Sequence, residues 1–184
     1  LTTITYTDDT ASYYPDAPYG SEWTCSVTAT DGDDSSEAAE ATVVQTEGWQ
    51  MLSLANAHSC ALDGNDDISC WGRSSFGELA VPGSGYIDVS AGDKYTCAVE
   101  SDGLVDCWGW DDFGETSPPA LVFEQVAAGW QETCGRRPDG TVICWGTDER
   151  DIISTVPASA FTDVQMTQGY NACGLNIAGE VECW

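Results

Sequence analysis

Cysteine is the residue type whose number and spacing point most directly to chemistry in this sequence. Eight of the nine cysteines form four pairs with the same internal spacing of ten residues, and a tryptophan follows the second cysteine each time. The pairs are Cys60 and Cys70, Cys97 and Cys107, Cys134 and Cys144, and Cys173 and Cys183. Two chemistries use cysteines in pairs, namely zinc binding and disulfide formation.

Zinc fits this spacing less well than a disulfide does. Zinc sites usually take cysteines about two to four residues apart, often with supporting histidines, and His58 is the only histidine of the chain. We therefore predict four disulfides, one within each pair. Stable disulfides indicate an oxidising, extracellular location.

The charge balance excludes several classes of function. Of the charged residues, 31 are Asp or Glu and 5 are Lys or Arg, so the net charge is −26. Contact with DNA or RNA phosphates relies on Lys and Arg, and so does docking on an anionic membrane. No apolar run reaches the roughly 18 residues that span a bilayer. We expect neither nucleic-acid binding nor membrane insertion.

Acidic turns are the candidate metal sites. Asp31, Asp33 and Asp34 supply oxygen ligands of the kind that Ca2+ takes, although a solvated turn explains the same residues. The acidic stretch 63–67 could likewise be either a calcium ligand set or a solvated turn. Calcium is thus the one cofactor that the sequence suggests. His58 shares its repeat position with Tyr95 and Glu132, and without a second histidine it supports no catalytic triad. We expect no catalysis.

Each cysteine pair predicts a β-hairpin. In residues 97–109 a three-residue loop at 101–103 places Glu100 opposite Leu104 and Cys97 opposite Cys107. The last loop position favours a left-handed backbone, which glycine adopts without cost. That position holds glycine in three units and aspartate in the first: Gly103, Gly140, Gly179 and Asp66. The hairpin geometry therefore explains why the cysteines are ten residues apart.

The hairpins recur as a longer repeat. The first cysteines of the pairs stand at 60, 97, 134 and 173, a period of 37 to 39 residues that is typical of propellers and solenoids. A short apolar strand precedes each pair, as in 87–92, and a glycine follows the Trp in three units. Phe-Gly-Glu occurs at 76–78 and 113–115, and a proline follows. One repeat thus amounts to about three short strands that must stack on neighbours.

The pattern from Gly92 to Gly109, followed by Phe-Gly-Glu and proline, resembles the regulator of chromosome condensation repeat. The short period is similar to the bacterial version, including the seven-bladed β-lactamase inhibitory protein. The Cys-x9-Cys-Trp variant resembles secreted forms. The resemblance implies an all-β fold with four propeller-type repeats at about 48–86, 87–122, 123–160 and 161–184. The chromatin role of the family does not transfer, because the chain lacks a basic surface.

Four repeats are fewer than the roughly seven that a closed propeller of this type implies. We therefore expect a partial β-propeller or an open array. Three explanations remain open: a piece of a longer polypeptide, a subunit whose open ends pair with other copies, or a complete open solenoid. Exposed strand edges favour pairing and head-to-tail assembly.

Residues 1–47 form a different module. Residues 20–30 alternate as a half-buried strand, 31–36 form an acidic turn, and 40–45 read as the returning strand. This pattern resembles the last two strands of a bacterial immunoglobulin-like domain, in which a cysteine at this place pairs with one on an early strand. No such strand is recognisable, so Cys25 is the odd cysteine. We expect its partner in another segment or another chain, with a buried thiol as the alternative.

The leading hypothesis is a non-catalytic, secreted structural or adhesive protein of a bacterial cell surface or extracellular assembly, able to form filaments through its open edges. The alternative is a propeller module that binds another protein, as an inhibitor or receptor does. Trp110 and Trp130 depart from the repeat pattern and are candidate partner contacts, as is the basic pair Arg136 and Arg137. Acidic repeats that stack closely repel one another, so assembly should respond to salt or divalent cations.

Overall fold

A computed structural model describes residues 2–5, 22–27, 39–44, 48–169 and 171–184. The chain divides into two compact units, residues 1–48 and residues 49–184. The described residues are all-β, as predicted, and contain no helix that is long and apolar enough to cross a membrane.

The first unit contains a three-stranded sheet in the order β1-β2-β3. Strands β2 (Glu22–Val27) and β3 (Ala39–Val44) pair antiparallel, as the sequence predicts. The sheet also holds an early strand that the sequence did not reveal, β1 (Thr2–Thr5), which runs parallel to β2. The immunoglobulin-like assignment stays a prediction.

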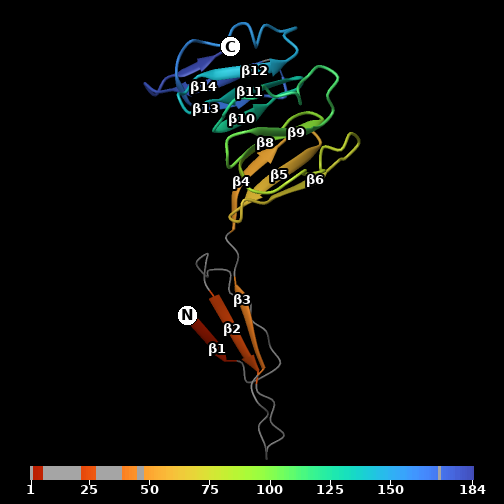
Figure 1. Cartoon of the computed structure of the whole chain (residues 1–184), viewed down its shortest axis with the longest axis vertical. Helices are drawn as coiled ribbons and strands as arrows, with labels where there is room; N and C mark the ends of the chain where they lie inside the picture. Colours follow the sequence, from red (N-terminus) through yellow and green to blue (C-terminus); the bar gives the residue numbers. More distant parts are fainter. Residues whose placement is uncertain (1, 6–21, 28–38, 45–47, 170) are drawn as a thin grey trace, which may run out of the picture. The chain divides into compact units, whose positions relative to one another are not determined.

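The second unit consists of four three-stranded antiparallel sheets, one per predicted repeat. The sheets are β4 (Trp49–Leu54), β5 (His58–Asp63) and β6 (Ile68–Gly72); β7 (Tyr86–Ala91), β8 (Tyr95–Glu100) and β9 (Val105–Gly109); β10 (Gln125–Ala128), β11 (Glu132–Arg136) and β12 (Val142–Gly146); and β13 (Phe161–Met166), β14 (Ala172–Asn176) and β15 (Val181–Cys183). They follow one another in chain order from yellow to blue in Figure 1. The four sheets do not close into a ring, which matches the expected partial propeller.

The hairpin turns have the predicted geometry. In the second repeat the Gly103 amide donates to the Glu100 carbonyl at 2.8 Å, and the Glu100 amide donates to Leu104 at 2.8 Å. Gly103 has a φ of +86°, and Asp66 takes the same left-handed conformation in the first repeat, with a φ of +64°. The turn sets the register, so Cys97 lies opposite Cys107.

The glycine that follows the tryptophan in the first three repeats is required by a close backbone approach. A side chain at Gly109 would place its Cβ 2.6 Å from the Lys94 carbonyl oxygen and 2.7 Å from the Tyr95 Cα. Gly72 and Gly146 meet the equivalent backbone atoms in their own repeats. Only glycine lets the end of the third strand lie against the start of the second.

The apolar core lies between consecutive sheets. Each repeat has a forward face, which packs on the next repeat, and a backward face, which packs on the preceding one. At the first junction, forward residues Met51, Cys60, Leu62, Ile68 and Cys70 meet backward residues Tyr86, Val89, Ala98 and Trp108. Both faces of an inner sheet are therefore covered, which explains why the central strand β8 is buried at five consecutive residues.

Candidate functional site

Disulfides join the two cysteines of each predicted pair, Cys60 to Cys70, Cys97 to Cys107, Cys134 to Cys144 and Cys173 to Cys183. The paired Cα atoms are 3.9 to 4.1 Å apart, because the cysteines face each other across the second and third strands. The cysteines of the first three pairs form part of the junction cores, on the face that packs on the next repeat. Each disulfide therefore holds a hairpin, and the first three also supply a packing surface for the next repeat.

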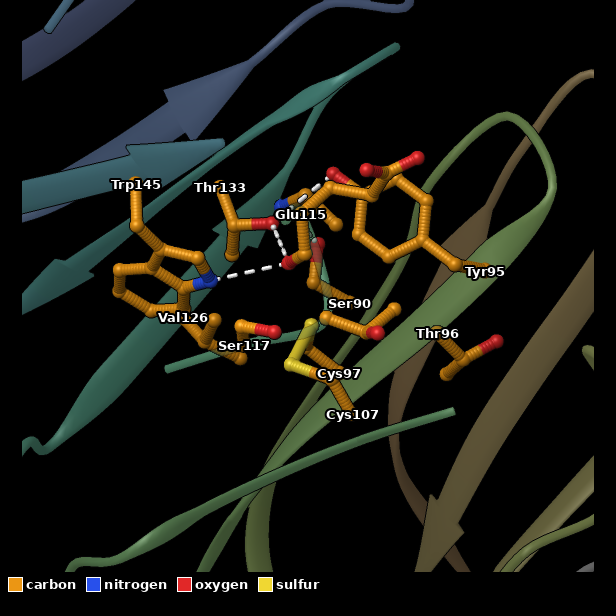
Figure 2. Close-up of a disulfide and its surroundings, with 12 residues drawn as sticks. Ser90, Tyr95, Thr96, Cys97, Cys107, Glu115, Ser117, Val126, Thr133 and Trp145 are labelled. Atoms are coloured by element: carbon orange, nitrogen blue, oxygen red, sulfur yellow. Dashed lines mark hydrogen bonds between the residues drawn. A yellow bond between two sulfur atoms is a disulfide. The ribbon is translucent and has the colours of Figure 1, made fainter. Parts of the chain in front are cut away.

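A polar clasp links the second repeat to the third (Figure 2). The backbone carbonyl of Glu115 accepts a hydrogen bond from the indole Nε1 of Trp145 at 2.9 Å and lies 2.9 Å from the Thr133 hydroxyl. Glu115 follows the second sheet, whereas Trp145 and Thr133 belong to the third. One carbonyl thus joins two repeats.

The same clasp links the first repeat to the second. Trp108 Nε1 donates to the Glu78 carbonyl at 2.9 Å, and the Thr96 hydroxyl donates to it at 3.0 Å. The recurrence explains why Phe-Gly-Glu and Cys-Trp appear in the same repeat unit. The glutamate carbonyl of one repeat accepts a hydrogen bond from the tryptophan of the next.

Each clasp threonine also meets the residue that begins the second strand of the preceding repeat. His58 Nε2 lies 2.8 Å from the Thr96 hydroxyl, and the Tyr95 hydroxyl lies 2.9 Å from that of Thr133. Tyr95 also donates to the Glu132 carbonyl at 2.7 Å. Burial lowers the pKa of His58 and raises that of Tyr95, so the neutral form is favoured at both positions. His58 therefore has a structural role.

The glutamate carboxylates of the two Phe-Gly-Glu turns point inward and hold the turns. Glu78 accepts hydrogen bonds from the amides of Ser75 at 3.1 Å and Phe76 at 2.6 Å. Burial tends to raise the pKa of Glu78, but the backbone donors outweigh it and the pKa is lowered. At Glu115 burial prevails and the pKa is raised, although the carboxylate accepts from the Phe113 amide at 2.8 Å. The buried glutamates leave both phenylalanines at the surface.

The two exposed phenylalanines belong to a group that we call the aromatic cluster, together with two half-buried residues: Phe76, Lys94, Trp110 and Phe113. The Trp110 ring lies 5.9 Å from that of Phe76 and 5.5 Å from that of Phe113, in an edge-to-face arrangement with the latter. The Lys94 ammonium lies 4.1 Å from the Trp110 ring centre, within cation–π range. The cluster thus joins the first two repeats and presents two large apolar side chains to solvent.

The other predicted contact residues each have a neighbour within the chain. Trp130 is half-buried, and the Arg150 guanidinium lies over its ring at 4.3 Å. Arg136 binds Glu124 at 2.9 Å, and Arg137 lies 3.8 Å from Asp139. Trp110 is the predicted contact that belongs to the aromatic cluster as defined here. Which of these residues contact a partner stays a prediction.

The predicted calcium site at Asp31, Asp33 and Asp34 lies outside the described residues. Within the described residues, no group of three or more His, Cys, Asp or Glu side chains is placed to hold a metal ion. At the second acidic tip, the Asp63 carboxylate instead accepts the amides of Asn65 at 2.9 Å and Asp67 at 3.0 Å.

Cys25, the predicted odd cysteine, lies in β2 with Ile4 of β1 and Ala41 of β3 as its register neighbours. The early strand β1 contains no cysteine. An early strand does precede Cys25, contrary to expectation, but it supplies no cysteine to pair with it. What Cys25 pairs with stays a prediction.

Sequence reasoning missed Phe76, Phe113 and Lys94 as surface contacts. The available signal was the second copy of Phe-Gly-Glu next to Trp110, which lies where the first repeat has Arg73. The pattern does not say which residue of the element faces solvent. That depends on the buried glutamate and on the left-handed glycines Gly77 and Gly114, at φ +88° and +81°.

Comparison with known proteins agrees with this architecture. The regulator of chromosome condensation (RCC1) repeat matches residues 86–115, and no curated protein matches the chain. Among solved structures, the chain is similar to the ectodomain of the receptor kinase CR4 from Physcomitrella patens, with 28% identity and a TM-score of 0.64 over 77% of this chain and 42% of the other.

Two further structures share the fold. The CRINKLY WD40 ectodomain of the Arabidopsis thaliana receptor kinase ACR4 is 24% identical, with a TM-score of 0.63 over 80% of this chain and 62% of that one. Prp20p from Saccharomyces cerevisiae is 13% identical, with a TM-score of 0.64 over 80% and 48%. The chain spans 42% and 62% of the two receptor ectodomains. The matched repeat, the shared propeller architecture and the four disulfides show that residues 49–184 consist of RCC1-type, disulfide-containing repeats.

Proposed function

We propose that this chain is a non-catalytic, extracellular protein-interaction module with a structural or adhesive role at a bacterial cell surface. Four disulfides support an oxidising location. The similarity to the CR4 ectodomain supports the same location, since that protein is the outer part of a receptor kinase. Stapled repeats provide a stiff scaffold whose surface can be offered to another protein.

The observation that carries the proposal is the aromatic cluster. Phe76 and Phe113 are exposed, yet buried carboxylates and left-handed glycines fix their turns, so binding would order little additional backbone. Large aromatic side chains on a rigid surface are typical of residues that dominate protein interfaces. The cluster therefore supports protein binding better than catalysis.

The charge around the cluster indicates the kind of partner. Asp111 and Asp112 are exposed beside it, and the chain carries a net charge of −26. A partner with apolar side chains surrounded by Lys or Arg would complement this surface, since opposite charges steer association and exposed rings attract cations. We therefore propose a basic protein surface as the ligand of the cluster.

Site-specific crosslinking tests the proposal. The chain with a photoreactive phenylalanine analogue at position 113 is added to the extracellular fraction of the producing cells. The matched control carries the analogue at position 104, where Leu104 is also exposed but lies on a hairpin turn away from the cluster. A defined protein should crosslink at position 113 and not at position 104.

Purified partner then provides the quantitative test. Phe76→Ser combined with Phe113→Ser should weaken binding by at least tenfold, on the order of 1.4 kcal/mol. Leu104→Ser should leave binding unchanged. Equal crosslinking at both positions, or equal affinity of the double variant, would contradict the proposal.

The receptor-like or inhibitor-like alternative is favoured by the CR4 similarity. The identity of the crosslinked protein separates the two functions. A component of the cell surface supports the structural or adhesive role. A soluble enzyme, or a ligand that also binds freely in solution, supports the alternative.

A further inference from the structure

The ammonium group of Lys94 lies against two rings of the aromatic cluster. It is 4.1 Å from the centre of the Trp110 ring and 5.5 Å from the centre of the Phe76 ring. A carboxylate is also near, because Oδ2 of Asp93 lies 3.9 Å from the Lys94 Nζ. Two aromatic rings and one carboxylate thus form a site that suits an ammonium group.

Repeat stacking does not require this contact. The equivalent positions hold other residues in the first and third repeats, Ala57 with Arg73 and Gln131 with Thr147. Both repeats nevertheless form the same three-stranded sheet and the same disulfide. The contact between lysine and tryptophan is therefore an addition to the repeat and not part of its common packing.

The groups around the ammonium are fixed, whereas the lysine side chain is not. The Trp110 amide donates to the Lys94 carbonyl at 3.1 Å, and the turn of Phe76 is held by a buried carboxylate. Asp93 is buried, and its carboxylate accepts a hydrogen bond from the Asn56 side chain at 3.3 Å. The Lys94 side chain is 29% exposed and reaches the rings on a flexible four-carbon stem. The ammonium is therefore the movable part of the site.

The charge of this surface leaves room for a second cation. Asp111 and Asp112 are exposed next to Trp110 in the sequence, and Asp93 contacts the ammonium. Lys94 is the only lysine of the chain, which has five basic residues and 31 acidic ones. Another positive side chain can thus approach the cluster without net repulsion.

We propose that Lys94 is the internal occupant of a lysine-binding site, and that a lysine of the partner protein replaces it between Trp110 and Phe76. This inference rests on the proposed binding at the aromatic cluster and names the group that the cluster takes. Exchange of one ammonium for another leaves the charge of the site unchanged. The gain in affinity then comes from apolar contacts beside the exchanged lysine, so the site selects a lysine with apolar neighbours over an isolated amine.

The single lysine permits a direct test by NMR spectroscopy. The whole chain, produced with isotope-labelled lysine, gives one side-chain signal from Lys94. The Trp110 ring should shift this signal upfield, because the protons next to the ammonium lie over its face. Trp110→Leu removes the ring and gives the position of the signal without this shift.

A blocked Leu-Lys-Leu peptide is the probe, and a blocked Leu-Gln-Leu peptide at the same ionic strength is its matched control. The lysine peptide should move the Lys94 signal most of the way to its position in Trp110→Leu. The glutamine peptide should leave the signal in place, because it has no ammonium to exchange. In Trp110→Leu neither peptide should move the signal.

Removal of the internal occupant provides a second measurement. Lys94→Met keeps a long side chain without the ammonium, so the lysine peptide should bind at least about threefold more tightly, because the free site is always available. The shift of the Trp110 indole signal measures the affinity. Ser101→Asp changes the net charge by the same amount at the exposed turn after β8, and its affinity should stay within about twofold of the unmodified chain.

Three results would overturn the inference: no upfield shift of Lys94 in the unmodified chain, equal movement with both peptides, or no tighter binding by Lys94→Met. The proposed function fails separately. A protein that crosslinks at position 113 but leaves the Lys94 signal in place supports the function and contradicts lysine exchange. Movement of Lys94 by the lysine peptide, with no protein crosslinked at position 113, supports the lysine site and contradicts the function.

Discussion

The first two repeat junctions and the third junction complete the same apolar packing in different ways. At the first two, a glutamate carbonyl receives the indole and threonine groups of the next repeat. At the third, Ala172 replaces the threonine, and the Nε1 of Trp184 is buried without a hydrogen-bond partner among the described residues. The third junction therefore lacks the polar clasp.

An apolar side chain occupies the third junction instead. Residues 147–157 replace Phe-Gly-Glu, and Ile152 lies fully buried among Cys134, Phe161 and Ala172. The loop is held by Asp148, whose carboxylate accepts the Ile153 amide at 2.7 Å. Stacked repeats thus need a covered junction, and either a hydrogen-bonded carbonyl or an inserted aliphatic side chain can complete it.

Removing Ile152 should have the largest effect on the free energy of unfolding. The change would show how much apolar packing stabilises the third junction. Ile152→Ala deletes a fully buried side chain and should lower the free energy of unfolding by about 2–5 kcal/mol. Urea unfolding measures the change. The control Ile177→Ala, at an exposed position, should shift it by less than about 0.5 kcal/mol. Equal small effects would mean that Ile152 does not support the junction.

Removing single disulfides compares a covered junction with an uncovered face. The Cys97–Cys107 and Cys173–Cys183 loops have the same length, so loss of either should cost at most about 3 kcal/mol in chain entropy. Replacing Cys97 and Cys107 by alanine should cost about 1 kcal/mol more than replacing Cys173 and Cys183, because Cys97 is fully buried in the second junction. Non-reducing urea unfolding at low protein concentration measures both. Equal losses would show that the sulfurs contribute no packing.

A pH series should distinguish the second junction from the third. The Val126 amide donates to the buried Asp88 carboxylate, whereas Val164 donates to the neutral Gln125 amide. Burial raises the pKa of Asp88 to about 6 from 3.8, although Val126 and Arg136 oppose the rise. Asp163 raises it further. The folded chain therefore binds this proton more tightly than the unfolded chain.

The free energy of unfolding should consequently fall as pH rises from about 4 to about 6, by at most about 3 kcal/mol for Asp88, and stay low above that range. Asp88→Asn keeps an acceptor without the charge, so it should stabilise the chain at pH 7.5 and have little effect at pH 4.5. The exposed Asp112→Asn controls for the loss of one charge. A pH profile unchanged by Asp88→Asn would contradict the assignment.

The smallest expected difference is between two tryptophan variants, one with and one without the clasp hydrogen bond. Trp145→Phe removes the donor to the Glu115 carbonyl, and Trp184→Phe removes an N–H that has no partner among the described residues. Both variants make the same indole-to-phenyl change, and the hydrogen bond should make the loss of unfolding free energy about 1 kcal/mol larger for Trp145, which is also the more buried of the two. We expect Trp145→Phe to be the more destabilising. The reverse order would show that the clasp adds no stability.

Much of each repeat could be predicted because its determinants are local. The ten-residue spacing of Cys97 and Cys107, with Gly103 at the last turn position, sets loop length and register within one hairpin. Asp66 adopts the same left-handed conformation in the first repeat. The short parallel strand β1 was missed because its four residues pair with β2 about 20 residues away.

The candidate surfaces were harder to predict because they depend on contacts between repeats. Trp110 was identified from its departure from the repeat, but its neighbours Phe76 and Lys94 come from other turns. Arg136 binds Gln125 of the neighbouring strand and Glu124 of the loop before it, contacts that the sequence pattern did not predict. Side chains that meet across a junction share no short-range pattern.

The sequence by itself determined the hairpins, their disulfide spacing and the number of repeats, since these depend on turn chemistry and on a period that can be read directly. Only the tertiary structure decided which copy of an equivalent residue is buried. Trp71 and Trp108 each stand between a cysteine and a glycine, but among residues 49–184 only Trp108 packs against a preceding repeat. The burial of a residue depends on the neighbouring repeat, so residues of the same type at the same repeat position are buried in one repeat and exposed in another.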